Sequence, residues 1–197
     1  CKRNVIPYTT IATDASESVV MYRLSTTSAK FLVTCTDISQ VSGVTQVHPK
    51  DIMRERDHHN AYDMENVDVR STLCSTWLRG DAPRPVDASH PNFILFTSGS
   101  TGKPKGIVHV HGGYQVGLCL TSDVVLHLCQ TDVLFVAATP AWITGQSYMI
   151  SSALLRACPS VLFEGSMLSP PSRFAQIIQR HGVSVFKAGS TFLRVVM

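Results

Sequence analysis

The sequence predicts an α/β fold in which strands and helices alternate along a parallel-type sheet. From Phe93 onward, short apolar runs alternate with stretches of helical periodicity, which is the pattern of strands joined by crossover helices. Pro83, Pro85 and Pro91 precede this region and mark a connector. With 197 residues and 44% apolar composition, the chain is long enough to bury the core of one medium-sized domain.

Composition divides the chain into two parts. Residues 1–90 are polar and rich in Ser and Thr, with one clear strand at Phe31–Thr36. Residues 91–197 form the predicted α/β subdomain. Its expected strands are Phe93–Thr97, Ile107–Val110, Val133–Ala137, Ser160–Glu164 and Val183–Phe186, and its expected helices are Gly113–Leu128, Ser147–Arg156, Ser172–His181 and Thr191–Met197. The last helix has no Gly, Asn or Pro to end it, so we expect the natural chain to continue.

Charge and cysteine content exclude several classes of protein. The 17 Lys and Arg residues are scattered among 14 Asp and Glu residues, which argues against a nucleic-acid partner. No apolar run approaches the roughly 18 residues that cross a bilayer, so we expect no membrane partner. The cysteines form no C-x-x-C pair, and Cys119, Cys129 and Cys158 are predicted to be small buried hydrophobes. Reduced thiols favour the cytoplasm. A mitochondrial location stays open, because the sequence begins at Cys1 instead of methionine.

A loop with the sequence TSGSTGKPKG follows the strand Phe93–Thr97 directly. Its glycines let backbone N–H groups approach an anion closely, and its hydroxyls and lysines add donors and positive charge. The residues concerned are Thr97, Ser98, Gly99, Ser100, Thr101, Gly102, Lys103, Lys105 and Gly106. Ligands of open α/β sheets bind at the carboxyl ends of strands. The loop is therefore predicted to hold a polyphosphate.

Two better-known motifs do not fit this loop. A P-loop requires G-x-x-x-x-G-K-[ST], but the sixth position counted from Gly99 is Pro104. The segment Ser100–Lys103 satisfies S-x-x-K, and Lys187–Gly189 is faintly similar to the K-T-G of penicillin-binding enzymes. Gly102 and Pro104 are unsuited to the helix that this motif needs, so we discount the second match.

The loop resembles the phosphate-loop signature of the adenylate-forming (AMP-binding) superfamily over all ten residues. The segments Ile107–Tyr114 and Ala141–Tyr148 are similar to the acetyl-CoA synthetase branch of short-chain acyl-CoA synthetases. Phe163–Gly165 with Arg173 and Phe174 continues the similarity, which extends over about Val86–Met197 and more faintly over Val5–Tyr8. The resemblance implies that the chain is part of the large N-terminal domain of an adenylate-forming ligase.

By this resemblance, the loop from Thr97 to Gly106 binds the ATP phosphates, and Lys105 is the expected catalytic residue. Trp142, Ile143 and Thr144 are expected to line a small acyl pocket. The implied reaction joins acetate or another short-chain carboxylate to CoA through an acyl-adenylate. It would consume ATP and require Mg²⁺. The family's remaining contacts and its C-terminal catalytic domain lie beyond the equivalent of Met197, so this chain by itself is expected to form no acyl-adenylate.

Three departures leave alternatives open. The branch usually has Gly at the position of Ala141 and His at the position of Gln146, and residues 166–169 differ from its CoA-contacting stretch. The chain could therefore be an adenylation domain of another adenylate-forming enzyme, or a truncated, non-catalytic nucleotide-binding protein. Trp142 could also be an ordinary core residue.

The histidine pairs predict no metal site. His58 and His59 are adjacent and therefore point in different directions, with no partner at a ligand spacing. His109 and His111 alternate on a predicted strand and are expected to share a face, but a third ligand is missing from the pattern. We expect them to give polar support near the phosphate loop.

Overall fold

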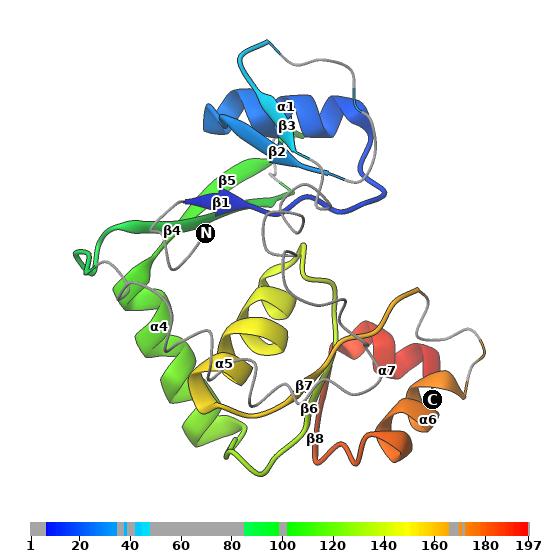
Figure 1. Ribbon diagram of the computed structural model, residues 1–197. Helices are drawn as coiled ribbons and strands as arrows, with labels where there is room; N and C mark the ends of the chain where they lie inside the picture. Colours follow the sequence, from blue (N-terminus) through cyan, green and yellow to red (C-terminus); the bar gives the residue numbers. More distant parts are fainter. Residues whose placement is uncertain are drawn as a thin grey trace, which may run out of the picture. The chain divides into compact units, whose positions relative to one another are not determined.

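The computed structural model describes residues 7–34, 38, 42–47, 85–98, 102–165, 170 and 172–196 (Figure 1). The chain forms two compact units, of which one comprises Cys1–Ala12 with Pro83–Met197 and the other comprises Thr13–Ala82. His58 and His59, for which the sequence predicts no metal site, lie outside the described residues. Within those residues, no helix is both long and apolar enough to span a bilayer.

The smaller unit contains one helix and two short strands. Helix α1 spans Glu17–Thr27, and strands β2 (Phe31–Val33) and β3 (Thr45–Val47) pair in parallel. The apolar side chains Val20, Leu24 and Leu32 are buried. The strand predicted at Phe31–Thr36 is thereby confirmed as far as Val33, and its last two residues lie outside the described part of the chain.

The first sheet of the larger unit is mixed. It consists of β1 (Tyr8–Thr9), β4 (Pro91–Thr97) and β5 (Lys105–Val110) in the order β1-β4-β5. β1 runs parallel to β4, whereas β5 runs antiparallel to it. The parallel arrangement expected for these two consecutive strands is therefore wrong. Only residues 98–104 connect them, and a parallel crossover needs about a dozen residues or more.

The second sheet confirms the predicted parallel pattern. Strands β6 (Leu134–Ala137), β7 (Ser160–Val161) and β8 (Val185–Ala188) are all parallel, in the order β7-β6-β8. Its strands are shorter than expected at β7 and shifted by two residues at β8. Each connection between these strands contains a helix, as a parallel sheet requires.

Helices join the strands in the predicted order. α4 (His111–Leu120) continues into the π-helical segment η2 (Thr121–Val125), so this helix begins earlier and ends earlier than predicted. A second π-helical segment, η3 (Gly145–Ser152), continues into α5 (Ala153–Arg156). The last two helices are α6 (Arg173–Arg180) and α7 (Ser190–Val196).

The second sheet has an apolar layer on each face, and Figure 1 shows helices on both sides of it. On one face, a cluster of buried side chains from β6, η3, α5 and two connecting segments forms the core: Leu128, Leu134, Val136, Met149, Ala153 and Cys158. On the other face, rings from β6, β8, α6 and α7 pack together: Phe135, Phe186, Phe174 and Phe192. The prediction that Cys158 is buried is confirmed, but Cys119 and Cys129 are exposed.

Two buried hydroxyls link η2 to η3. Ser122 and Ser152 are fully buried, and their Oγ atoms lie 2.8 Å apart. Ser122 Oγ also lies 2.7 Å from the carbonyl oxygen of Leu118. A buried hydroxyl costs free energy unless it is hydrogen-bonded, so replacing either serine removes a hydrogen-bond partner from the other.

We predict that Ser122→Ala lowers the free energy of unfolding by about 1–2 kcal/mol, because it removes one partner and leaves the other buried. The double variant Ser122→Ala/Ser152→Ala should cost less than the sum of the two single variants. Urea denaturation of the four proteins measures these differences. Strictly additive costs would contradict the prediction.

Candidate functional site

The predicted phosphate loop is the connection of a β-hairpin. Thr97, the last residue of β4, is opposite Lys105, the first residue of β5. The antiparallel ladder between the two strands therefore fixes both ends of the loop. A loop followed by a second antiparallel strand also differs from a P-loop, which opens into a helix. Gly99, Ser100 and Thr101 lie outside the described residues.

The described part of the loop offers cations and hydroxyls to solvent. Ser98, Lys103 and Lys105 are exposed, and Thr97 is half-buried. Among the described residues, no carboxylate forms an ion pair with either lysine. Gly102 has φ +83°, a conformation that side chains disfavour, and open space surrounds the position of a Cβ. The ammonium groups are thus available to an anionic ligand.

Gly106 has a packing role in the hairpin. A Cβ at this position would lie 3.2 Å from Ile94 Cγ2 and 3.4 Å from the Phe96 ring. The missing side chain lets β5 pass close over these two residues of β4. Sequence reasoning considered only the approach of Gly106 to phosphate, and packing is a second reason for a glycine here.

The face of the hairpin that carries Lys105 continues into a cluster of rings. Side chains alternate along a strand, so Lys105 and His109 share a face of β5. The His109 ring stacks on Phe93 with centroids 4.6 Å apart, and Tyr114 of α4 meets Phe93 edge-on at 4.8 Å. Burial lowers the pKa of His109 below its usual 6.5. A neutral imidazole therefore supports the hairpin, as expected for this residue.

His111 does not share that face. β5 ends at Val110, and His111 begins α4. The centroids of the His111 and His90 rings are 5.9 Å apart, and the backbone N–H of His111 donates to the His90 carbonyl oxygen at 3.0 Å. The expected side-by-side pair of His109 and His111 is therefore wrong, because the strand becomes a helix between them. Within the described ranges, no three His, Cys, Asp or Glu side chains gather as metal ligands would.

Hydrogen bonds join the ring cluster to the start of η3. Tyr8 Oη donates to Gln146 Oε1 at 3.0 Å, and Gln146 Nε2 donates to the Pro140 carbonyl oxygen at 2.6 Å. Tyr114 Oη donates to Ser147 Oγ at 3.1 Å. Burial, with a smaller contribution from Tyr114, raises the pKa of Tyr8 to about 12, so its phenol stays a donor. Sequence reasoning noted Gln146 as a departure but assigned no role to it or to the two tyrosines.

The predicted acyl segment forms a tight turn at the carboxyl end of β6. The Trp142 N–H donates to the Thr139 carbonyl oxygen at 3.1 Å, and the Gln146 N–H donates to the Trp142 carbonyl oxygen at 3.0 Å. Trp142 is 48% exposed, so it is not an ordinary core residue. Ile143 and Thr144 are half-buried. The turn and the hairpin are therefore two parts of one region, connected through Gln146 and Tyr8.

Gly145 makes this turn possible. A Cβ at Gly145 would overlap the Thr139 carbonyl group, at 2.6 Å from its carbon, and would lie 2.9 Å from the nitrogen of Pro140. Both neighbours are backbone atoms that cannot rotate away. A side chain of any size at this position would therefore push η3 away from the turn.

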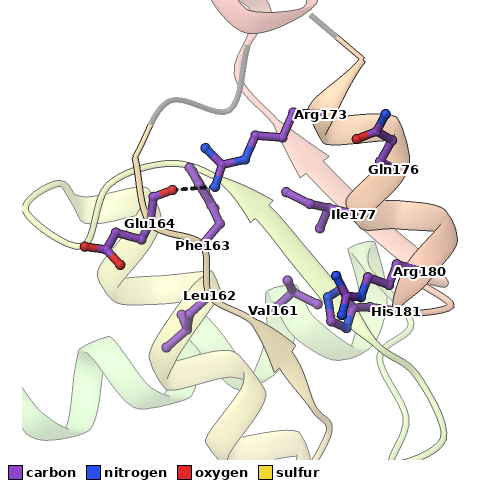
Figure 2. A pocket seen from close by; sticks show the side chains of 9 residues that line it. All are labelled: Val161, Leu162, Phe163, Glu164, Arg173, Gln176, Ile177, Arg180 and His181. Carbon is purple, nitrogen blue, oxygen red and sulfur yellow. Dashed lines mark hydrogen bonds between the residues drawn. The ribbon is translucent and has the colours of Figure 1, made fainter. Parts of the chain in front are cut away.

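A separate open groove of about 370 Å³ lies between the end of β7 and α6 (Figure 2). The Arg173 guanidinium crosses its upper end and donates to the Glu164 carbonyl oxygen at 2.6 Å. Apolar side chains line its middle and two basic residue types line its lower end: Val161, Phe163, Ile177, Arg180 and His181. No residue of the hairpin or of the turn lines this groove.

Residues 1–197 match the profile of the family described as AMP-binding enzyme. The acetyl-coenzyme A synthetase of Pyrobaculum aerophilum is 42% identical over 116 residues, which are 58% of this chain and 17% of that protein. This chain thus spans less than a fifth of that relative's length. The crystal structure of Brucella canis acyl-CoA synthetase has a similar fold, with a TM-score of 0.71 at 20% identity over 96% of this chain and 34% of that one. The Klebsiella oxytoca NpsA N-terminal subdomain, in complex with 3-hydroxybenzoyl-AMSN, gives a TM-score of 0.63 at 17% identity. The match covers 89% of this chain and 39% of that one.

We predict that Gly145→Ala destabilises the chain by about 1–3 kcal/mol, the usual cost of inserting a methyl group into a packed site. Gly117→Ala is the matched control, because Gly117 lies within α4 and nothing lies within 4 Å of its Cβ position. The control should be stabilised by up to about 1 kcal/mol through helix propensity. Urea denaturation tests both, and equal effects of the two variants would contradict the steric argument.

The lowered pKa of His109 predicts a pH dependence of stability. The unfolded chain takes up this proton near pH 6.5, before the folded chain does. The free energy of unfolding should therefore be highest above pH 6.5 and should fall as the pH drops below it. His109→Phe keeps a stacked ring without the titration, so the difference in pH dependence between the two proteins isolates this residue. An imidazole pKa of 6.5 or higher, measured by NMR, would refute the prediction.

Proposed function

Because this chain is a member of the AMP-binding enzyme family, we propose that it forms the phosphate-binding part of an ATP-dependent ligase for a short-chain carboxylate and CoA. The reaction consumes acetate or a similar acid, ATP and CoA, and it yields acyl-CoA, AMP and pyrophosphate. The similarity to acetyl-coenzyme A synthetase supports a short-chain acid and the thiol of CoA as the two substrates that are joined. The exposed lysines of the hairpin loop support ATP as the third substrate.

One observation carries the proposal: the loop that ends at Lys105 presents positive charge that no carboxylate among the described residues neutralises. Lys105 is held at the base of the hairpin opposite Thr97, and Lys103 lies within the loop. Both ammonium groups are exposed, and no described carboxylate pairs with them. Hydrogen bonds from charged donors to phosphate oxygens contribute about 1.5–3 kcal/mol each. The β- and γ-phosphates of ATP are the anions that we assign to this loop.

The loop would act mainly on the leaving group. A carboxylate oxygen attacks the α-phosphorus of ATP, the bond from this phosphorus to the bridging oxygen breaks, and pyrophosphate departs with the negative charge. Catalysis of such steps depends on fixed donors that meet developing charge. Lys105 is the proposed catalytic residue, and the remaining binding residues are Thr97, Ser98, Gly99, Ser100, Thr101, Gly102, Lys103 and Gly106. In the second step the CoA thiol attacks the acyl carbonyl, and AMP leaves.

The turn at Trp142–Thr144 is the proposed acyl site. Its half-exposed indole is available to a ligand, as a buried core tryptophan would not be. The hydrogen bonds of Gln146 tie this turn to Tyr8, which pairs with Phe93 in the hairpin. Such ties support an arrangement in which the carboxylate and the nucleotide phosphates are held by one rigid unit.

Magnesium does not fit the described loop residues as a site of its own. Mg²⁺ prefers carboxylate, phosphate and water oxygens, whereas the described loop supplies hydroxyl groups and amines. We propose that Mg²⁺ enters with the ATP phosphates and that any protein carboxylate for it comes from elsewhere.

We predict that Lys105→Ala weakens binding of ATP to this chain about tenfold, which corresponds to the loss of one charge-assisted hydrogen bond. Lys30→Ala is the matched control, because Lys30 is an exposed lysine of the smaller unit. Its affinity for ATP should equal that of the unchanged chain. Isothermal titration with ATP and with pyrophosphate measures both.

Equal losses in the two variants would mean that ATP binds through general charge, and absence of binding at millimolar ATP would overturn the proposal. Because the chain spans 17% of the P. aerophilum relative, we expect it to form no acyl-adenylate by itself. ATP–pyrophosphate exchange above the level of Lys105→Ala would show otherwise.

A further inference from the structure

Lys187 occupies a position in β8 where the pattern of the sheet calls for an apolar side chain. Phe186 points to one face, where its ring packs with Phe174 and Phe192. Val185 points to the opposite face and packs against the core cluster that includes Met149 of η3. Alternation along the strand puts Lys187 on the same face as Val185, toward η3. A cation thus follows the apolar core directly at the end of the strand.

The Lys187 ammonium has an aromatic neighbour in this layer. Its Nζ lies 4.1 Å from the centroid of the Tyr148 ring in η3. The residue is half-buried, and no carboxylate in the described part of the chain forms an ion pair with it. A ring face compensates only part of the lost hydration of a cation, about 0.5–2 kcal/mol. The ammonium therefore retains capacity for an anion.

This cation lies at the carboxyl edge of the parallel sheet. Val136 and Ala137 of β6 are opposite Lys187 and Ala188. β6 then leaves the sheet and leads within a few residues to the turn that carries Trp142. Ligands of α/β sheets bind at this edge. Lys187 and the turn are thus contributed by neighbouring strands at the edge where a ligand is expected.

We propose that Lys187 binds a second negative group of the acyl substrate, so that the site takes a short dicarboxylate in preference to a monocarboxylate of the same length. The inference rests on the proposed function, because it assumes that the turn at Trp142 receives the acyl group. One carboxylate of the substrate reacts with ATP, and the other accepts a charge-assisted hydrogen bond from the ammonium of Lys187.

Two stable analogues of the acyl-adenylate test the proposal: succinyl- and butanoyl-sulfamoyl adenosine. Both acyl chains have four carbons, and they differ in a terminal carboxylate against a terminal methyl group. The chain should bind the succinyl analogue about tenfold more tightly in isothermal titration. Lys187→Met, which keeps an unbranched side chain one atom shorter and without the ammonium, should lose this preference, and Lys187→Arg should keep it.

Each outcome decides between the proposal and its alternatives. A preference that is absent in the unchanged chain, or retained in Lys187→Met, overturns the inference. A lysine that only packs on Tyr148 would lower thermal stability in Lys187→Met without changing the ratio of the two affinities. If Lys187→Met fails to fold, the ratio in the unchanged chain and in Lys187→Arg still decides. If ATP binds with the expected dependence on Lys105 but the ratio is one, this inference alone fails. If ATP and both analogues fail to bind, the proposed function fails with it.

Discussion

The packing of Phe93 against three other rings holds the hairpin of the candidate site in position. Phe93 is fully buried, and its ring lies 4.6 Å from that of His109, 4.8 Å from that of Tyr114 and 5.7 Å from that of Tyr8. These rings come from β5, α4 and β1. Truncation of such a buried aromatic side chain usually costs about 3–5 kcal/mol. One side chain of β4 thus connects every element that surrounds it, and this contact explains why Tyr8 belongs to the same unit as residues far along the chain.

The two tyrosines extend this packing to the acyl turn. Each contacts Phe93 with its ring and uses its hydroxyl for a hydrogen bond to η3, as tyrosines with a buried ring commonly do at their polar end. Gln146 then bonds to the Pro140 carbonyl group inside the turn, and it is only 3% exposed. Displacing the hairpin relative to the turn would therefore break these partly buried hydrogen bonds as well as ring contacts. The base of the loop between β4 and β5 is thereby held in place relative to the turn.

Local patterns predicted the second sheet well and the first sheet less well. Apolar runs bounded by turn residues identified β6, β7 and β8, and the helices between them required a parallel arrangement. The same rule applied to residues 98–104 excludes a parallel crossover, so the direction of β5 was available from the spacing alone. The start of α4 at His111 could not be predicted from the sequence, because the H-x-H pattern is compatible with a strand and with the start of a helix.

Long-range contacts of the site could not be predicted from the sequence. Tyr8 and Gln146 are 138 residues apart, and no periodicity connects residues at that distance. The composition of the phosphate loop is a local signal and was legible over ten residues. Gly145 carries no such signal, because its need for a missing side chain depends on where the Thr139 carbonyl group lies after folding.

Departures from consistent patterning point to the carboxyl edge of the second sheet. Sequences generally agree with their structure at every level, and the exceptions concentrate at functional sites. Trp142 is 48% exposed although large aromatic residues usually fill cores. Lys187 replaces an apolar side chain on the core face of β8 and has a ring, not an acid, as its neighbour. Trp142 leaves apolar area exposed, and Lys187 gives up part of the hydration of its ammonium group. Because both lie at the ends of adjacent parallel strands, one ligand at this edge would account for both exceptions.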